Sequence, residues 1–149
     1  MGMMLAVSPN GDFVASIPLA LTIGPKSLTD WKRRIPPSRY KAGQVLFYRG
    51  HLPYGLFVIH EGAVELRITE KDLHAPLKAG PGAMLGLASL VANQPYPLTA
   101  LVVNDVLVSF TEKSTLLHWI QHSDPLLVHE LKFLKGGNEI KRKSARKSV

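Results

Sequence analysis

The sequence predicts a mainly β protein, an antiparallel β-roll or jelly roll with flanking helices at both ends. From Ser38 onward, short runs rich in β-branched and aromatic residues alternate with glycine-containing turns. In one run Val64, Leu66 and Ile68 alternate with polar residues, which predicts a strand with one solvated face. Apolar residues at helical spacing follow near the carboxyl end. Short strands joined by turns are typical of antiparallel rolls.

Residues 1–33 are predicted to be an N-terminal segment that contains one short helix. Ser27 or Thr29 is expected to cap this helix, which reaches Arg34. The Pro36-Pro37 pair ends it, because proline lacks the N–H that a continuing helix needs.

Residues 34–111 are predicted to form the roll. The Glu61-Gly62 pair predicts a two-residue hairpin loop, since glycine supplies the positive φ of a primed turn. Turns are also expected at Gly80-Pro81-Gly82 and at Asn104-Asp105. The expected strands cover 38–41, 45–48, 56–60, 64–69, 75–78, 98–103 and 106–110.

Residues 112–135 are predicted to be helical. Thr111 is expected to cap a first helix, with Leu116, Leu117 and Ile120 on one face.

A second helix is expected to start at Ser123 or Asp124. It carries an apolar stripe at i, i+4 and i+7, made of Leu127, Leu131 and Leu134. An apolar stripe in water favours association, so this helix is the predicted seam of a homodimer.

The composition restricts the functional classes. The 149-residue chain has no cysteine, which excludes disulfides, thiol catalysis and cysteine-ligated metals, and a cytoplasmic location is expected. No apolar run is long enough to cross a membrane. No catalytic triad, carboxylate pair or phosphate-binding loop is recognisable, so an enzyme is not predicted. The sequence predicts no metal site and no cofactor, because the His118 and His122 pair lacks further ligands.

The net charge of +7 lies mostly at the carboxyl end. From Lys132 onward there are seven basic residues and one acidic residue, so the first 131 residues are nearly neutral. Residues 136–149 are predicted to be a basic, disordered tail. Such a tail either is a solvated terminus or contacts nucleic acid or another anionic surface by charge alone.

One segment between two predicted strands has the features of a binding site. A glycine opens a short helical run there, and the backbone N–H groups at such a helix start can hold an anion. The candidate ligand-contacting residues are Gly86, Leu87, Ala88, Ser89, Tyr96, Pro97, Leu98 and Thr99. Any pocket is expected to be apolar or filled, with a lining of Leu85, Leu87, Tyr96, Leu98 and Val58.

The order of glycines between hydrophobic strands resembles that of the cyclic-nucleotide-binding domain, the β-roll sensor of catabolite-activator-type bacterial regulators. The glycines are Gly43, Gly50, Gly62, Gly80, Gly82 and Gly86. In that family a Gly-Glu-Leu cassette is followed by an Arg-Ala or Arg-Ser pair. The resemblance implies that the Glu position holds the ribose hydroxyl and the Arg position the cyclic phosphate. Here Leu87 and Tyr96 stand at those two positions, so neither the acceptor nor the charge is present.

The resemblance implies a regulatory or sensor module with a degenerate cassette. It would act through a small-molecule ligand or a protein partner rather than through cyclic AMP or cyclic GMP. One alternative is a genuine cyclic-nucleotide regulator related to transcription factors of the catabolite-activator type. Another is a structural dimerisation module with a filled pocket. The chain ends before the helix-turn-helix of such regulators would begin, so no DNA-binding domain is predicted. No membrane contact is predicted either, because no apolar run is long enough to span a bilayer.

Overall fold

The fold is given by a computed structural model that describes residues 6–7, 13–14, 20–68 and 77–127. Its strands are β1 (Ala6–Val7), β2 (Phe13–Val14), β3 (Ala20–Thr22), β4 (Ser38–Tyr40), β5 (Val45–Phe47), β6 (Gly55–Glu61), β7 (Val64–Arg67), β8 (Leu77–Ala79), β9 (Ala83–Leu85), β10 (Thr99–Val102) and β11 (Val106–Glu112). Its helices are α1 (Pro25–Arg34), α2 (Leu87–Ala92) and α3 (Lys113–Gln121).

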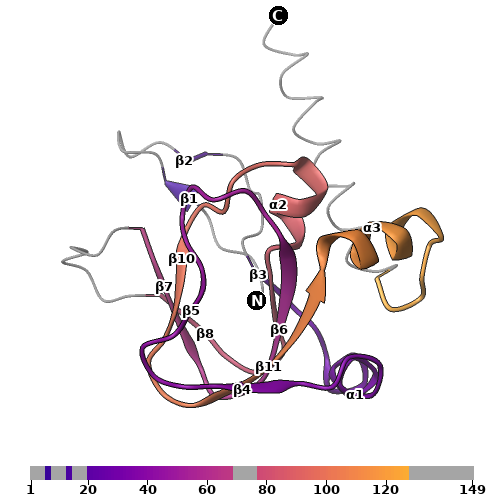
Figure 1. Ribbon diagram of the computed structural model, residues 1–149, viewed down its shortest axis with the longest axis horizontal. Coiled ribbons are helices and arrows are strands. Elements are labelled where there is room, and N and C mark those ends of the chain that lie inside the picture. Colours follow the sequence, from indigo (N-terminus) through magenta and orange to yellow (C-terminus); the bar gives the residue numbers. More distant parts are fainter. Residues whose placement is uncertain (1–5, 8–12, 15–19, 69–76, 128–149) are drawn as a thin grey trace, which may run out of the picture.

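Two antiparallel sheets form the roll, as the sequence predicts. One sheet has the order β5-β10-β7-β8 and the other has the order β3-β9-β6-β11-β4. A separate pair is formed by β1 and β2. Figure 1 shows the two larger sheets facing each other, with α1 and α3 on the outer side of the five-stranded sheet. The arrangement is therefore mainly β with helices outside the roll.

The predicted hairpin at Glu61-Gly62 is wrong, because the strands on either side of it belong to different sheets. β6 pairs with β9 and β11, whereas β7 pairs with β8 and β10. Gly62 does have a positive φ of 83°, and a Cβ atom there would lie 2.7 Å from the carbonyl oxygen of Asp105. The glycine thus allows the chain to turn a corner of the roll close to the start of β11.

Several strand boundaries differ from the predicted ones. β3 and β9 were not expected, because each has only three residues, and β9 shows no alternation since all three of its residues are buried. Ile68 follows β7 and is 49% exposed rather than part of the buried face. The predicted strand 75–78 corresponds to β8, although residues 75 and 76 lie outside the described part.

α1 begins differently from the prediction. Gly24 is its N-cap and Pro25 occupies its first turn, with no side-chain cap from Ser27 or Thr29. The Thr29 hydroxyl instead donates to the carbonyl of Pro25 at 3.0 Å. The helix ends before the Pro36-Pro37 pair, as expected.

The start of α3 also differs from the prediction. Thr111 belongs to β11, where it pairs with Leu56, so it cannot act as the cap. Leu116 and Trp119 are the buried residues of α3, while Leu117 is 36% exposed. The i, i+3 spacing of the two buried residues directs them toward the sheet.

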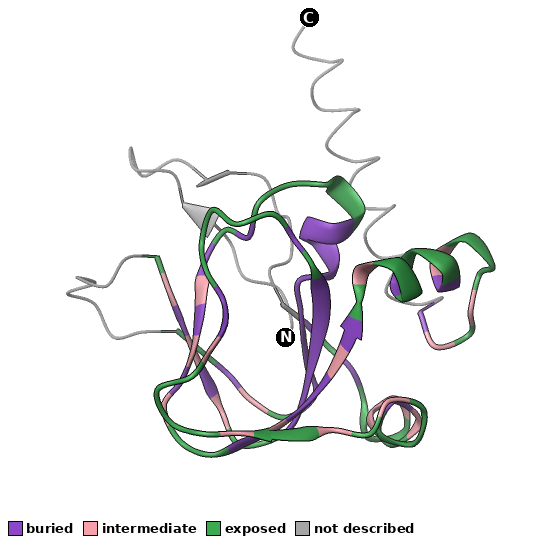
Figure 2. Ribbon diagram, in the orientation of Figure 1, coloured by how far each residue is buried: buried purple, intermediate pink, exposed green. Residues whose placement is uncertain are grey.

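Two hydrophobic clusters lie on the two faces of the five-stranded sheet. The first, here called the roll core, fills the space between the sheets and includes Phe47, Phe57, Leu85, Tyr96 and Leu98. The second, here called the helix-layer core, lies under the helices and contains Trp31, Leu56, Val58, Met84, Leu87, Leu116, Trp119 and Leu127 among others. Figure 2 shows β6, which contributes to both clusters, buried along its length except for Glu61 at its end.

Two polar contacts attach α1 to the rest of the fold. Arg34 makes two hydrogen bonds to the carboxylate of Asp124, at 2.6 and 2.9 Å, and its guanidinium lies 4.5 Å from the ring centroid of Trp119. At the end of α1, the hydroxyl of Ser109 donates to the carbonyl of Ile35 at 2.7 Å. Nε2 of His60 lies 2.6 Å from the same hydroxyl oxygen. Because Ser109 has one proton to donate, His60 must be the donor to it.

Among the helices of the described residues, none is both long enough and apolar enough to cross a lipid bilayer.

Candidate functional site

The candidate segment connects the two sheets. It leaves the five-stranded sheet at β9, forms α2, and enters the four-stranded sheet at β10. Gly86 caps α2 with a φ of 99°, and a Cβ atom there would lie 3.1 Å from Gly55 O and 3.2 Å from a ring carbon of Tyr96. Glycine is required at this point, because the backbone conformation and the contact both disfavour a side chain.

Tyr96 is the central side chain of the segment. It is 1% exposed, and its ring stacks on Phe47 with 4.2 Å between the ring centroids. Its hydroxyl donates to the carbonyl of Gly55 at 2.9 Å and accepts N–H groups from Tyr54 at 3.0 Å and Gly55 at 3.3 Å. The phenol is therefore fully hydrogen-bonded at the start of β6. Burial raises the pKa of Tyr96, which keeps the hydroxyl neutral.

The backbone of Tyr96 is held as firmly as its side chain. Its N–H donates to the carbonyl of His51 at 3.0 Å, and its carbonyl accepts the N–H of Gly50 at 2.9 Å. These bonds join the 50–51 turn to the candidate segment. Tyr96 thus connects two loops and one strand.

Aromatic rings surround Tyr96 within the roll. Tyr54 lies edge-on to Tyr96 at 5.7 Å, and Phe57 contacts both Phe47 and Phe110. The hydroxyl of Tyr54 donates to the carbonyl of Leu46. Burial, followed by the neighbouring Tyr96, raises the pKa of Tyr54 to about 12. Both phenols are thus neutral over the physiological pH range.

The interior around this aromatic group is apolar. Every other member of the roll core is an aliphatic or phenylalanine side chain. Across the described residues, the buried polar side chains are those of His60, Ser89, Ser109 and Thr111, and none of these has a permanent charge. A phosphate placed inside the roll would therefore meet no cationic side chain of the described chain.

The predicted pocket lining is divided between the two cores. Leu85 and Leu98 join Tyr96 in the roll core, whereas Leu87 and Val58 belong to the helix-layer core. The division arises because α2 places Leu87 and Leu90, three residues apart, on the face that packs under the helices. Leu87 therefore does not line the same space as Tyr96.

The other predicted contact residues lie in varied positions. Ala88 and Ser89 are buried in α2, while Pro97 is exposed. The hydroxyl of Thr99 accepts the backbone N–H of Arg49 at 3.0 Å. Arg49 was missed by the sequence reasoning because it comes from a distant turn. Its guanidinium is directed to the carbonyl of Ile68, at 3.1 Å, rather than into the roll.

A surface groove of about 590 Å³ lies beside this aromatic group. Tyr54 and Phe110 contribute aromatic rings to it, and Glu112 and Lys113 contribute charge at the start of α3. The remaining lining residues are Pro53, Ser114 and Leu117. No sequence pattern indicated this groove, because its residues come from the loop before β6, the end of β11 and the start of α3.

Of the predicted dimer stripe, Leu127 is the residue that lies within the described part of the chain. Leu127 is fully buried in the helix-layer core, so it stabilises the fold of the protomer. Leu131 and Leu134 lie outside the described residues.

The His118 and His122 rings lie 4.2 Å apart, but Nδ1 of His122 contacts the carbonyl oxygen of His118 at 2.9 Å. In the described ranges, no three histidine, aspartate or glutamate side chains gather closely enough to hold a metal ion.

Comparisons with known proteins agree with the fold. The family model of the cyclic nucleotide-binding domain matches residues 37–123. No curated protein matches the sequence.

Solved structures with low sequence identity share the same fold. One, from work on a cyclic-GMP-dependent signalling pathway that regulates bacterial phytopathogenesis, has a TM-score of 0.61 at 21% identity, covering 83% of this chain and 96% of that chain. The catabolite activator protein of Thermus thermophilus has a TM-score of 0.59 at 22% identity, covering 85% of this chain and 59% of that chain. The N-terminal domain of a Streptomyces coelicolor transcriptional regulator has a TM-score of 0.57 at 19% identity, covering 85% of this chain and 87% of that chain.

Proposed function

Because the chain belongs to the cyclic nucleotide-binding domain family, we propose that it is a regulatory module of that fold in which Tyr96 occupies the place of the nucleotide. The observation that carries this proposal is the buried phenol, stacked on Phe47 and bonded to both the N–H and the carbonyl of Gly55. In the family this cassette position holds an arginine that pairs with the phosphate. Here it holds a neutral side chain that binds the protein itself.

Electrostatics support the same conclusion. A cyclic nucleotide carries one negative charge on its phosphodiester, and a charge moved from water into an apolar interior must be paired. The roll core offers apolar side chains and a phenol with all its hydrogen bonds already made. Leu87 cannot replace the missing acceptor for the ribose, because it packs in the helix-layer core.

Displacement of Tyr96 by a ligand would carry a large cost. The ligand would have to break three hydrogen bonds to the hydroxyl, each worth about 1 kcal/mol net, in addition to the stacking contact. A nucleotide whose phosphate meets no cationic side chain cannot offset the loss of these hydrogen bonds and of the stacking contact. We therefore propose that the module acts through a protein partner, without an enzymatic activity of its own.

Titration calorimetry of the full chain with cyclic AMP and cyclic GMP tests this function. We expect no heat of binding with either nucleotide at ~100 μM. A dissociation constant of about 10 μM or tighter, which corresponds to roughly 7 kcal/mol of affinity, would instead support a genuine cyclic-nucleotide sensor. A regulator of this fold that is known to bind cyclic AMP serves as the positive control in the same buffer.

A further inference from the structure

The charges of this chain are segregated into two basic segments and a mildly acidic remainder. Residues 25–41 contain six basic residues and one acidic residue, a net charge of +5. Residues 132–149 contain seven basic residues and one acidic residue, a net charge of +6. The other 114 residues contain five basic and nine acidic residues, a net charge of −4. The near neutrality of the first 131 residues is thus an average over two opposite regions.

The structure places the first basic segment on one continuous element pair, α1 and β4. Residues 35–37 join the two elements directly, and Figure 1 shows β4 leading from α1 along one edge of the roll. Five cations on this pair or directly after it, here called the α1–β4 face, are solvent-exposed. They are Lys26, Lys32, Arg33, Arg39 and Lys41.

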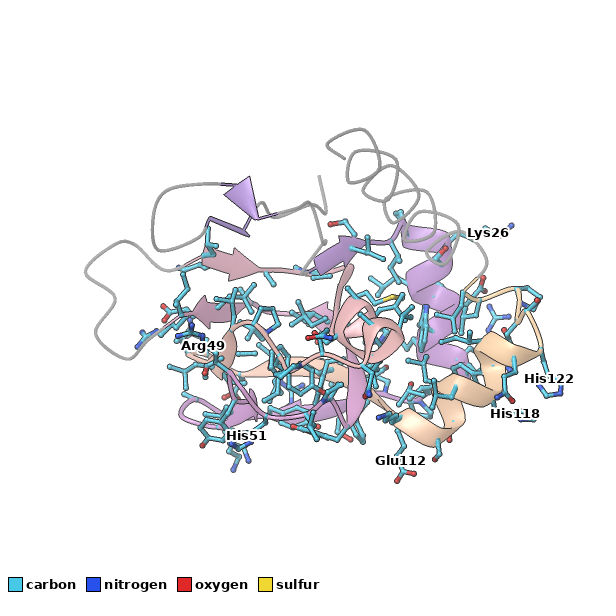
Figure 3. All side chains as sticks on the ribbon, turned by 90° about the horizontal axis from the view of Figure 1, so that it is seen from above. Lys26, Arg49, His51, Glu112, His118 and His122 are labelled. Atoms are coloured by element: carbon cyan, nitrogen blue, oxygen red, sulfur yellow. The ribbon has the colours of Figure 1, made fainter. Side chains whose placement is uncertain are left out.

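These five cations have no carboxylate partner among the residues that the structure describes. The ion pairs of that part of the chain are Arg34 with Asp124 and Arg67 with Glu65. Arg34 is therefore excluded from the face, because its guanidinium is already committed. Lys26 and Arg33 are seven residues apart on α1 and so lie on one side of the helix, away from the buried Trp31. Figure 3 shows Lys26 directed outward, at the end of the molecule opposite Arg49 and His51.

Helix-dipole complementarity accounts for only part of this charge. Lys32 and Arg33 lie in the last turn of α1, where cations are favoured. Lys26 lies in the first turn, where a cation is disfavoured, and the first turn of α1 has no acidic residue. Arg39 and Lys41 lie outside the helix altogether. The dipole therefore cannot explain the excess of positive charge along residues 25–41, where Asp30 is the one acidic residue.

The chemistry of the α1–β4 face fits a polyanion. Unpaired lysines and arginines on one surface are the usual electrostatic footprint of phosphate-backbone binding. An anionic membrane is a weaker fit, because peripheral membrane anchors combine cations with exposed apolar side chains. The large exposed apolar residues of the described chain all lie outside residues 20–41. They are Tyr48, Leu52, Tyr54, Ile68, Leu77, Val91 and Leu117.

We infer that the α1–β4 face binds the phosphate backbone of nucleic acid without reading its sequence. The dissociation constant should fall in the range of about 10⁻⁴ to 10⁻⁶ M that is typical of non-specific binding at physiological salt. The basic segment at residues 132–149 adds charge of the same sign. This binding does not depend on the pocket, so the proposed function and this inference can fail separately.

Fluorescence anisotropy with a short labelled DNA duplex and the full chain tests the inference. The variant K26Q/R33Q/R39Q removes three charges from the α1–β4 face, and R49Q/K78Q/K113Q removes three from elsewhere on the described surface. Both variants lower the net charge equally, so they differ only in position. Urea denaturation of each variant confirms that the fold is retained.

We expect the first variant to lose at least about tenfold in affinity at low salt and the second to stay within about threefold of the unmodified chain. The slope of log K against log salt should become shallower by about 2.7 in the first variant, since each phosphate contact contributes about 0.9. Equal losses in both variants would overturn the inference in favour of net charge alone. Unchanged affinity in both would also overturn it. Binding to phosphatidylserine vesicles without binding to DNA would overturn it in favour of a membrane.

Discussion

Replacement of Tyr96 by phenylalanine isolates the contribution of one buried hydroxyl. The hydroxyl makes three hydrogen bonds, to Gly55 O, Gly55 N–H and Tyr54 N–H, and the Tyr96 side chain is almost fully inaccessible. Each bond is worth about 1 kcal/mol net, and the backbone groups left behind in a buried site lose their partner. We therefore expect Tyr96→Phe to lower the free energy of unfolding by about 3 kcal/mol. For a chain of this size, that corresponds to a fall in Tm of roughly 6–12 °C.

Tyr48→Phe is the matched control, because it makes the same chemical change at a side chain that is 52% exposed. No hydrogen bond involves the Tyr48 hydroxyl within the described residues, so its removal should cost less than about 0.5 kcal/mol. Urea denaturation followed by circular dichroism gives both free energies. If Tyr96→Phe is as stable as Tyr48→Phe, the hydroxyl does not hold the segment in place and the reasoning fails.

Three further perturbations test neighbouring parts of the structure. Tyr96→Ala leaves a cavity shaped for a phenol, so p-cresol should raise the Tm of this variant and leave the Tm of the unmodified chain unchanged. Equal shifts in Tm for both proteins would contradict a pocket filled by Tyr96. Burial and then Lys32 lower the pKa of His60 below 6.5, so the stability that the neutral imidazole provides is present above about pH 6.5 and is lost as the pH falls through the folded-state pKa. His60→Gln keeps a donor for Ser109 and should reduce the pH dependence of the free energy of unfolding between pH 7.5 and 5.5, measured by urea denaturation. An unchanged pH dependence would exclude His60 as the source of that dependence. The hydrogen bonds from Arg34 are the main cause that lowers the pKa of Asp124. Asp124→Asn should therefore lower the free energy of unfolding, measured by urea denaturation at pH 7, by about 1 kcal/mol, a figure discounted for the partial exposure of Arg34. An unchanged free energy would show that the pair does not attach α1.

The strand pattern was predictable where a strand has one wet face or a glycine at its end. Val64 and Leu66 alternate with Glu65 and Arg67, and this alternation indicates β7 directly. β9 could not be predicted in this way, because Ala83–Leu85 is buried on both faces and separates the roll core from the helix-layer core. Local periodicity carries no information about a short strand without a solvent side.

The pairing of strands required long-range information. Glu61-Gly62 has the composition of a hairpin loop, but β6 continues its pairing with β11 and β7 belongs to the other sheet. A glycine with positive φ serves a corner between sheets as well as a hairpin. The sequence therefore predicted the turn but not the partners of the strands that it connects.

The candidate site was predicted in its centre but not in its surroundings. Tyr96 and Gly86 were found because their spacing matches a family cassette, and they do lie in contact. Phe47, Tyr54 and Gly55, which hold Tyr96, come from a segment some forty residues earlier in the chain. Leu87 was assigned to the same pocket, but helical geometry directs it to the opposite side of the sheet. Side-chain direction in a short helix is set by tertiary packing, which a linear pattern does not contain.

The backbone amides of Tyr54 and Gly55 are the most direct reporters of whether Tyr96 fills the nucleotide site. Both N–H groups bond to the Tyr96 hydroxyl, so any ligand that displaces this side chain must change their NMR chemical shifts. A ¹H–¹⁵N correlation spectrum recorded with and without cyclic AMP, and again with cyclic GMP, measures this at nucleotide concentrations far above ~100 μM. If Tyr96 fills the nucleotide site, the Tyr54 and Gly55 resonances do not move with either nucleotide. Saturable shifts of both resonances would show that the nucleotide enters the roll and would contradict the central claim.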